Sequence, residues 1–291
     1  MKPPAFDYFA PESLDEALAL MAQHAGAAKP LAGGQSLVPA MNFRVAQPEI
    51  LVDLNRLPGL DFVRAVNGDV HIGAMTRQRR IEHDPLIAQR LPLLHETIPH
   101  IAHPQIRNRG TIGGSLAHAD PAAELPAIAV ALDARLRAQS ATGERWLTAH
   151  EFFLSMFTTG LAPDELLVEI AAPALPPRTG SSFVEFARRH GDYAIMGVAA
   201  LITLDEELRC QRARLIYLNA GDGPVDAGRA AEVLRGHAHS AQAVDAAVAA
   251  ADAEINPVGN VHASVAYQRH LAGALTRRAL AQAFDRASQD N

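Results

Sequence analysis

The segment RGTIGGSLAHADPAAELP, Arg109–Pro126, places two adjacent glycines and a small hydroxyl residue before two acidic side chains and an alanine-rich run. Glycine pairs cost backbone entropy, so they are kept mainly in tight turns, close helix crossings or main chain that approaches a ligand. A similar segment, AGGQSL at Ala32–Leu37, precedes it. In both segments, small residues after the glycines favour backbone amides that point in one direction. Such a nest binds phosphate oxygens without lysine or arginine.

Two such loops could hold a pyrophosphate from opposite sides, which a single turn cannot do. The alternative is that both are ordinary tight turns, the usual role of an isolated glycine pair. Neither segment matches the G-x-G-x-x-G dinucleotide fingerprint or the G-x-x-x-x-G-K-[ST] phosphate loop. The residues alone therefore leave two interpretations open, a phosphate cradle and a pair of turns.

Composition narrows the class of protein. The chain has 291 residues, 48% of them hydrophobic, and a formal net charge of -6, which argues against a nucleic-acid surface. Its basic run TRQRR, Thr76–Arg80, is expected on a solvated or partner-facing helix face. With Cys210 as the only cysteine, the chain can form no disulfide framework and cannot hold an iron–sulfur cluster through four thiolates. Because no signal-peptide pattern or membrane-length apolar run is present, we expect a cytoplasmic protein without a membrane span.

Local patterns predict a mixture of short strands and helices up to about residue 174. Capping boxes at residues 13–16 (SLDE) and 148–151 (TAHE) mark two helix starts. ILVDL at residues 50–54 and DVHIGAM at residues 69–75 are typical of buried strands. A helical run, HDPLIAQRLPLLHETIPHIA, is broken near its prolines, and another helix begins at about Ala123.

The proline-rich stretch APALPPRTG, Ala172–Gly180, lacks apolar periodicity and is the best domain boundary in the chain. Three strand-like runs and then three helical runs follow it. This order is typical of a small α+β domain with helices packed on one face of a sheet. We therefore predict an α+β protein with one domain over residues 1–174 and a second over residues 178–288.

AGGQS, QIRNRGTIGGS and ADPAAELP closely resemble the FAD-binding medium subunit of the molybdenum hydroxylases. That family includes the medium subunit of carbon monoxide dehydrogenase and the flavin domain of xanthine dehydrogenase. RRHGDYAIMGVAALI and YQRHLAGALTRRAL resemble the family's C-terminal domain, so the likeness runs from about Phe6 to about Phe284. It implies an FAD-binding domain with subdomains of about residues 1–55 and 56–174. The second domain would be of the carbon monoxide dehydrogenase flavoprotein type, with a three-stranded antiparallel sheet and helices.

The resemblance also implies which residues bind the cofactor. The FAD diphosphate would lie between a first loop of Ala32, Gly33, Gly34, Gln35 and Ser36 and a second loop of Thr111, Ile112, Gly113, Gly114 and Ser115. Glu124 matches a position where xanthine dehydrogenases carry an aspartate that contacts FAD. Leu166 or Leu167 corresponds to an apolar contact to the adenine end. Tyr193 matches an aromatic that lies against the isoalloxazine ring, where it offers contact area and a hydroxyl.

This chain departs from the family pattern at three places. Ser115 stands where many relatives have asparagine, and His118 where a small hydroxyl residue is common. Relatives often place a lysine shortly before the GDY segment, whereas this chain has FVEFA at Phe183–Ala187. Each departure alters an individual polar contact rather than the identity of the cofactor.

Other kinds of site are less well supported by the sequence. HETIPHIAH, His95–His103, gathers histidines but lacks H-E-x-x-H spacing, so we interpret them as surface or capping residues. HADPAAE, His118–Glu124, is explained by the family likeness without a metal. Ser115 lacks the elbow glycine of a serine hydrolase, and Cys210 is expected to be an inert strand residue. We predict no metal site and no acid–base catalytic residue.

The resemblance implies an electron-relay subunit. Electrons would pass from a molybdenum centre through two [2Fe–2S] clusters to FAD, and then to an acceptor such as NAD, a quinone or dioxygen. A small [2Fe–2S] subunit and a large molybdopterin subunit would be the partners, in a dimer of heterotrimers, and the single cysteine of this chain agrees with that division. A stand-alone flavin oxidoreductase and a flavin-free scaffold subunit remain the alternatives.

Overall fold

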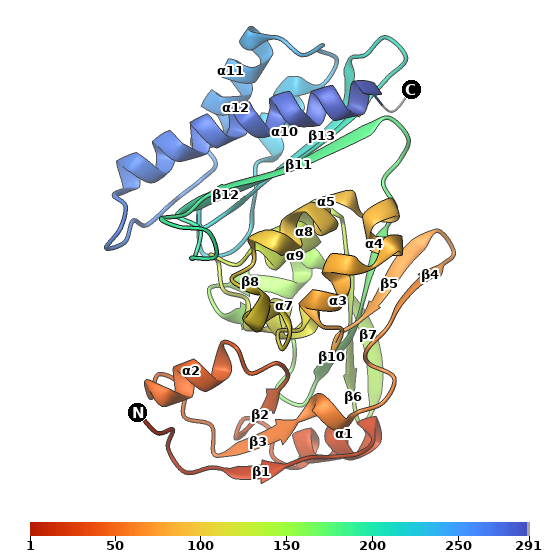
Figure 1. Cartoon of the computed structure of the whole chain (residues 1–291), viewed down its shortest axis with the longest axis vertical. Helices are drawn as coiled ribbons and strands as arrows, with labels where there is room; N and C mark the ends of the chain where they lie inside the picture. Colours follow the sequence, from red (N-terminus) through yellow and green to blue (C-terminus); the bar gives the residue numbers. More distant parts are fainter. Residues whose placement is uncertain (290–291) are drawn as a thin grey trace.

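The computed structural model describes residues 1–289. Figure 1 shows an elongated molecule in which a three-stranded, a five-stranded and a four-stranded sheet follow one another along the long axis. Helices and strands are mixed in all three parts, so the predicted α+β class is confirmed. None of the helices in residues 1–289 is long and apolar enough to cross a membrane.

The N-terminal part is a small parallel sheet with the strand order β1-β3-β2. Its elements are β1 (Asp7–Phe9), α1 (Leu14–Gln23), β2 (Ala28–Leu31), α2 (Leu37–Asn42), β3 (Ile50–Asp53) and the 3-10 helix η1 (Leu54–Arg56). Ser13 caps α1 by accepting from the Glu16 amide at 3.2 Å, although the Glu16 carboxylate bonds the amide of Glu12 rather than that of Ser13. The core of this part includes residues from β10, which anchors the small sheet to the next one.

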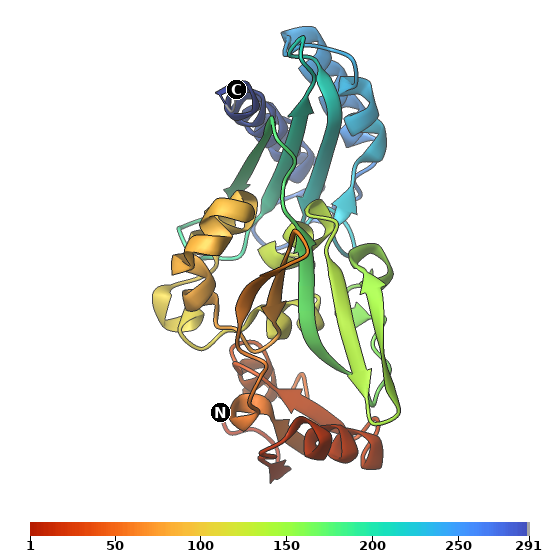
Figure 2. The ribbon, with the colours of Figure 1, turned by 90° about the vertical axis from the view of Figure 1, so that its right-hand side faces the viewer.

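The middle part is an antiparallel five-stranded sheet with the order β4-β5-β10-β6-β7. Its strands are β4 (Val63–Val66), β5 (Asp69–Gly73), β6 (Arg135–Ser140), β7 (Gly143–Thr148) and β10 (Leu166–Pro173). Short helices cover one face, as the orange helices beside the green strands show in Figure 2. They are α3 (Gln78–His83), α4 (Pro85–Arg90), α5 (Pro92–Thr97), η2 (Ile98–His100), α6 (Pro104–Arg107), α7 (Ile112–His118) and α8 (Glu124–Ala131).

A short insertion follows β7. It consists of α9 (Ala149–Phe152) and the two-stranded pair β8 (Phe153–Ser155) and β9 (Thr158–Thr159). The predicted capping box of α9 is complete, because Thr148 accepts from the Glu151 amide and the Glu151 carboxylate accepts from the Thr148 amide.

The C-terminal part is an antiparallel sheet of four strands, one more than predicted. The strands are β11 (Thr179–Phe186), β12 (Met196–Leu204), β13 (Cys210–Leu218) and β14 (Val225–Asp226), and the helices are α10 (Gly228–Leu234), α11 (Ala241–Asp252) and α12 (Val265–Gln289). The additional strand, β14, has only two residues. It pairs with β13 through Ile216 and Tyr217.

Helices cover both faces of this sheet, which corrects the prediction of one covered face. Val198 and Ala200 of β12 pack towards α10, α11 and α12, whereas Ala199 and Leu201 pack towards α8. The sequence of β12 is accordingly a continuous apolar run, as a strand buried on both faces requires. All eight residues of α8 are buried, and a helix that is apolar on every side suits a position between two sheets.

Candidate functional site

The two glycine loops lie in contact. The first follows β2 and leads into α2, and the second follows α6 and opens α7. A Cβ on Gly33 would collide with the carbonyl oxygen of Arg109 and come within 2.8 Å of the Gly110 Cα. A Cβ on Gly114 would lie 3.3 Å from the Cβ of Ala32. Segments almost eighty positions apart in the sequence therefore form one surface, and Gly33 is required by their close approach.

The other two glycines are needed for different reasons. Gly34 has φ +72°, a left-handed conformation that glycine adopts without strain. A Cβ on Gly113 would lie 2.5 Å from the Cβ and 2.6 Å from the carbonyl oxygen of Ala74, just beyond β5. In each pair, one glycine (Gly33 or Gly113) lets a distant part of the chain pack closely against the loop. The other (Gly34 or Gly114) meets a requirement within its own loop.

Backbone amides distinguish the two loops. Within residues 1–289, the amides of residues 33–36 donate to no protein acceptor, although they belong to partly or fully buried residues. In the second loop four consecutive amides are bonded inside the protein: Ile112 N to Thr76 O at 3.1 Å, Gly113 N to Ala74 O at 2.9 Å, Gly114 N to Thr111 Oγ1 at 3.0 Å and Ser115 N to Thr111 O at 3.2 Å.

The expectation of free amides in both loops is therefore correct for the first loop and wrong for the second. The second loop is the capped first turn of α7, held against β5, and its amides find acceptors there. Unbonded, partly buried amides require a partner. The first loop consequently has the stronger need for an anion, and it fits a phosphate group that approaches its main chain.

Three polar side chains tie the loops together, and sequence reasoning missed them. Asn55 donates from Nδ2 to the carbonyl of Ala32 at 2.9 Å. Arg77 donates to Asn55 Oδ1 at 2.6 Å and to the carbonyl of Arg109. The Asp53 carboxylate accepts a hydrogen bond from the backbone amide of Asn55 at 2.9 Å. Arg77 belongs to the run expected on a solvated or partner-facing helix surface, but it is instead a link between the two loops.

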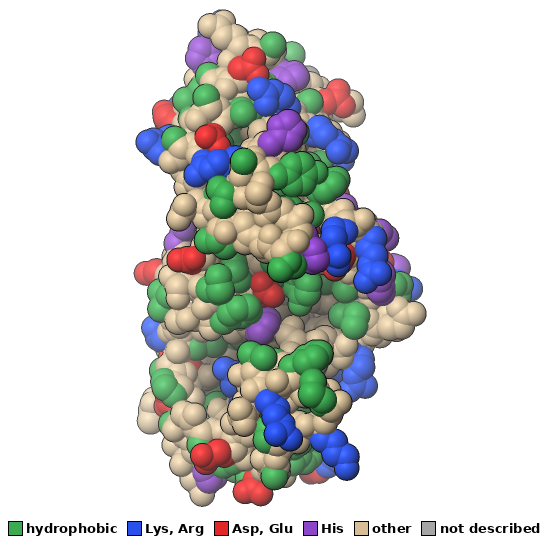
Figure 3. All heavy atoms as spheres, turned by 90° about the vertical axis from the view of Figure 1, so that its left-hand side faces the viewer, with side chains coloured by type: hydrophobic (Ala, Val, Ile, Leu, Met, Phe, Trp, Pro, Cys, Tyr) green, Lys and Arg blue, Asp and Glu red, His purple; other side chains and the backbone are tan. Residues whose placement is uncertain are grey.

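One face of the molecule is hollowed. In Figure 3 the hollow lies near the middle of the molecule, with acidic and histidine side chains among hydrophobic ones at its edge. Tyr193 is 65% exposed, so its ring is accessible to a flat ligand. Partial burial and the carboxylates of Asp120 and Glu124 raise the pKa of Tyr193. Tyr193 and the two acidic residues of the quoted segment therefore share one neighbourhood.

The other predicted contact residues are buried. Glu124, the first residue of α8, is 7% exposed, and burial followed by the charge of Glu185 raises its pKa to about 7. Leu166 and Leu167 are 2% and 6% exposed and belong to two different cores. Leu166 packs with the N-terminal sheet and Leu167 with the middle one. Their contact with the adenine end remains a prediction.

Histidines and the cysteine offer no alternative centre within residues 1–289. No group of three His, Cys, Asp or Glu side chains there is arranged to hold a metal ion. His100 is not a simple surface residue as expected, because its Nδ1 lies 3.3 Å from Glu185 Oε1. Burial lowers the pKa of His118, whose ring lies 5.1 Å from that of Phe157. Burial raises the pKa of Cys210 to about 11, so its thiol stays protonated.

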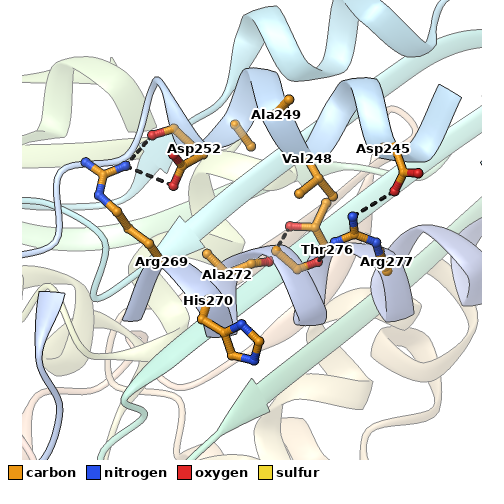
Figure 4. Close-up of a pocket in the computed structure, with 11 residues that line it drawn as sticks. Asp245, Val248, Ala249, Asp252, Arg269, His270, Ala272, Thr276 and Arg277 are labelled. Atoms are coloured by element: carbon orange, nitrogen blue, oxygen red, sulfur yellow. Dashed lines mark hydrogen bonds and ion pairs between the residues drawn. The ribbon is translucent and has the colours of Figure 1, made fainter. Parts of the chain in front are cut away.

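A separate cavity of about 320 Å³ lies between α11 and α12 (Figure 4). Arg269 donates to Asp252 at 3.0 Å and Arg277 to Asp245 at 2.7 Å across it. These pairs join the two helices. The lining residues all belong to α11 and α12, so this cavity is not part of the surface formed by the glycine loops.

Comparison with known proteins identifies the class. The family described as the FAD binding domain in molybdopterin dehydrogenase matches residues 4–175, and the CO dehydrogenase flavoprotein C-terminal domain matches residues 181–283. The chain belongs to the FAD-binding medium subunits of the molybdenum hydroxylase family, and its cofactor is FAD. As in other members, it is a subunit of an oxidoreductase.

Particular relatives are similar over the whole length. The chain is 47% identical to the 6-hydroxypseudooxynicotine dehydrogenase complex subunit alpha of Paenarthrobacter nicotinovorans, with 99% of this chain and 97% of that protein covered. It is 41% identical to the caffeine dehydrogenase subunit beta of Pseudomonas sp. strain CBB1, covering 98% and 97%. A solved carbon monoxide dehydrogenase from Hydrogenophaga pseudoflava that lacks the Mo-pyranopterin moiety matches with a TM-score of 0.95 at 40% identity, covering 98% and 99%.

Proposed function

We propose that the FAD diphosphate lies between the two glycine loops, with the amides of residues 33–36 as its main donors. The hydroxyls of Ser36 and Ser115 make no hydrogen bond within residues 1–289, so they are available as further donors. The observation that supports this most strongly is the contact between the loops, together with the unbonded amides on one of them. Asn55 and Arg77 would hold the loops in register without touching the phosphates.

The isoalloxazine ring would lie at the hollowed face, against the exposed ring of Tyr193. A flat aromatic side chain offers contact area to a ring of this kind, and its hydroxyl offers a hydrogen bond. Glu124 would act on the same region from the start of α8. When bound, FAD supplies the redox chemistry, and the residues named here bind it, orient it and set its electrostatic surroundings.

We infer that the chain relays electrons from [2Fe–2S] clusters of a small partner subunit to an external acceptor. A large molybdopterin subunit would complete the complex, as a dimer of heterotrimers. The single cysteine supports this division, because the chain cannot supply the four thiolates of such a cluster. The relatives named above carry subunit designations, and one is described as part of a complex. We also propose domain limits of residues 1–174 and 178–288.

The first experiment measures flavin. The purified chain should be yellow and carry close to one FAD per chain, and absence of flavin bands would favour the scaffold alternative. The relay is tested separately under anaerobic conditions. Addition of the reduced [2Fe–2S] partner should bleach the flavin absorbance, whereas flavin that is reduced by an organic substrate with no partner present would support the stand-alone oxidoreductase.

A further inference from the structure

Three titratable side chains from different elements interact electrostatically at the boundary between the middle and C-terminal parts. Glu124 is the first residue of α8, His100 the last of η2, and Glu185 lies in β11. Glu124 is 7% exposed, and the side chain of Glu185 is 6% exposed. The His100 side chain is 35% exposed and so connects this buried pair with solvent.

In the described chain, one carboxyl oxygen in this group, Glu185 Oε2, lacks the hydrogen-bond partner that a buried carboxylate needs. His100 Nδ1 lies 3.3 Å from the other oxygen of the same carboxyl group, Glu185 Oε1. The backbone amide of Glu124 itself donates a hydrogen bond that favours its ionised form, and this effect is smaller than that of burial. Burial and the nearby charge of Glu185 disfavour the ionised form of Glu124, so this arrangement favours a proton on Glu124.

The pKa values of Glu124 and His100 are both raised. Burial is the largest cause that raises the pKa of Glu124 to about 7, and the charge of Glu185 is the next. The hydrogen bond to Glu185 raises the pKa of His100. Glu124 and His100 each interact with Glu185 and with each other, so the protonation of Glu124 depends on the charge of His100.

Other charged and titratable groups surround the cluster on the elements packed against it. His190 places its ring 6.5 Å from that of His100, and Glu96 is paired with Arg286 at 2.7 Å. Asp120 and Glu124 both raise the pKa of Tyr193, and Asp192 does so more weakly. Glu124 is therefore close enough to interact with the aromatic residue that would face the flavin ring, while Arg286 is paired with Glu96.

We propose that Glu124, Glu185 and His100 form a charge-compensating proton site for the bound flavin, an inference that rests on the proposed function. When bound, FAD would accept two electrons from the [2Fe–2S] partner and one proton, which leaves one net negative charge on the reduced ring. In the proposed binding mode Glu124 would lie near that charge. The Glu124 carboxylate then binds a second proton, which arrives from solvent through His100, and both protons leave when the acceptor removes the two electrons.

The test follows the two-electron midpoint potential of the flavin bound to the full chain, at pH values on both sides of the pKa of Glu124, about 7. Above that pH the slope should steepen by about 30 mV per pH unit, because a tenfold change in proton activity is worth about 30 mV to a two-electron couple. Glu124→Gln should remove the steepening. Glu185→Gln should move it to lower pH, since it removes the like charge beside Glu124.

Glu96→Gln is the matched control, because it removes a carboxylate at the same boundary that is already paired with Arg286. It should keep the steepening. Identical slopes in the unmodified chain and Glu124→Gln would overturn the proposal. Thermal melts confirm that each variant is folded.

A second readout does not depend on the cofactor. Carbon-13 NMR of glutamate carboxyl groups in the full chain should show Glu124 titrating near neutral pH, and titration in the ordinary carboxylate range would contradict the inference. Flavin content therefore decides the proposed function, and the carboxyl titration decides whether the cluster holds a proton even in a chain that binds no flavin.

Discussion

At the scale of single residues, the four glycines of the two loops are not interchangeable. Gly33 and Gly113 permit close approach of other main chain, Gly34 supplies a positive φ, and Gly114 lies over its own capping threonine. A substitution at Gly33 separates the loops, whereas one at Gly114 first meets Thr111 Oγ1 at 2.8 Å. The site depends on main-chain geometry more than on side-chain chemistry.

Gly33→Ala should lower FAD content at least tenfold, because the new Cβ collides with Arg109 and displaces one loop from the other. The matched control is Gly180→Ala, whose Cβ collides with the carbonyl of Ala283 in the C-terminal part. Both changes should destabilise the protein by about 1–3 kcal/mol through overpacking. Flavin content per folded chain, from absorbance and total protein, should fall only for Gly33→Ala. An equal fall in both variants would show that general destabilisation, and not the contact between the loops, causes the loss of FAD.

Glu124→Gln should stabilise the flavin-free chain at pH 8 relative to the unmodified protein. The folded-state pKa of Glu124 is about 7, above its ordinary value of 4.5, so its stabilising contribution is complete below pH 4.5 and is lost as pH rises to about 7. The difference corresponds to about 3 kcal/mol at most. Urea unfolding at low and high pH measures it. A variant that is less stable at pH 8 would show that the buried carboxylate is stabilising when ionised.

At the scale of elements, the positions of several helix starts could be predicted because their signals are local. Pro85 and Pro92 each begin a new helix, and Pro99 is the second residue of η2, which confirms the breaks expected in that run. Proline lacks the amide that a first-turn residue leaves unbonded, so it suits these positions.

Arg77→Ala should weaken FAD binding by about tenfold, or about 1.4 kcal/mol, because it removes the link from Asn55 to Arg109 that holds the loops in register. Arg79→Ala is the control from the same basic run, since Arg79 contacts Glu82 at 3.1 Å and makes no bond to either loop. Fluorescence titration with FAD gives both affinities. Equal affinities in the two variants would mean that the link has no role in binding.

The sequence could suggest a phosphate cradle, but it could not show how the cradle is built. The acceptors that occupy the second loop's amides, Ala74 O and Thr76 O, lie more than thirty positions earlier in the chain. The link through Arg77 and the cluster at His100 likewise depend on residues brought together only by the fold. Local patterns find glycines and caps, whereas hydrogen bonds between distant elements leave no local signal.

At the scale of the whole molecule, the core is continuous across the proposed domain boundary. Ile128 and Val130 of α8 belong to the same buried cluster as Ala199, Leu201 and Ile216 of the C-terminal sheet. That sheet therefore has one face in common with the FAD-binding part. The second covered face explains why β12, at the centre of that sheet, is apolar along almost its whole length.

Thermal unfolding should consequently show one transition. Trp146 reports on β7 of the middle sheet, and far-ultraviolet circular dichroism reports largely on helices, including the long α12. Fluorescence and circular dichroism should give the same midpoint, because α8 cannot lose one sheet without exposing its apolar surface. Two separated transitions would show that the C-terminal part folds independently.

A crystal structure of the chain with FAD bound tests the central claim most directly. We expect diphosphate oxygens within hydrogen-bond distance of the amides of residues 33–36, with the second loop on their opposite side and the flavin ring against Tyr193. A diphosphate held elsewhere, with those amides facing only solvent, would contradict the account.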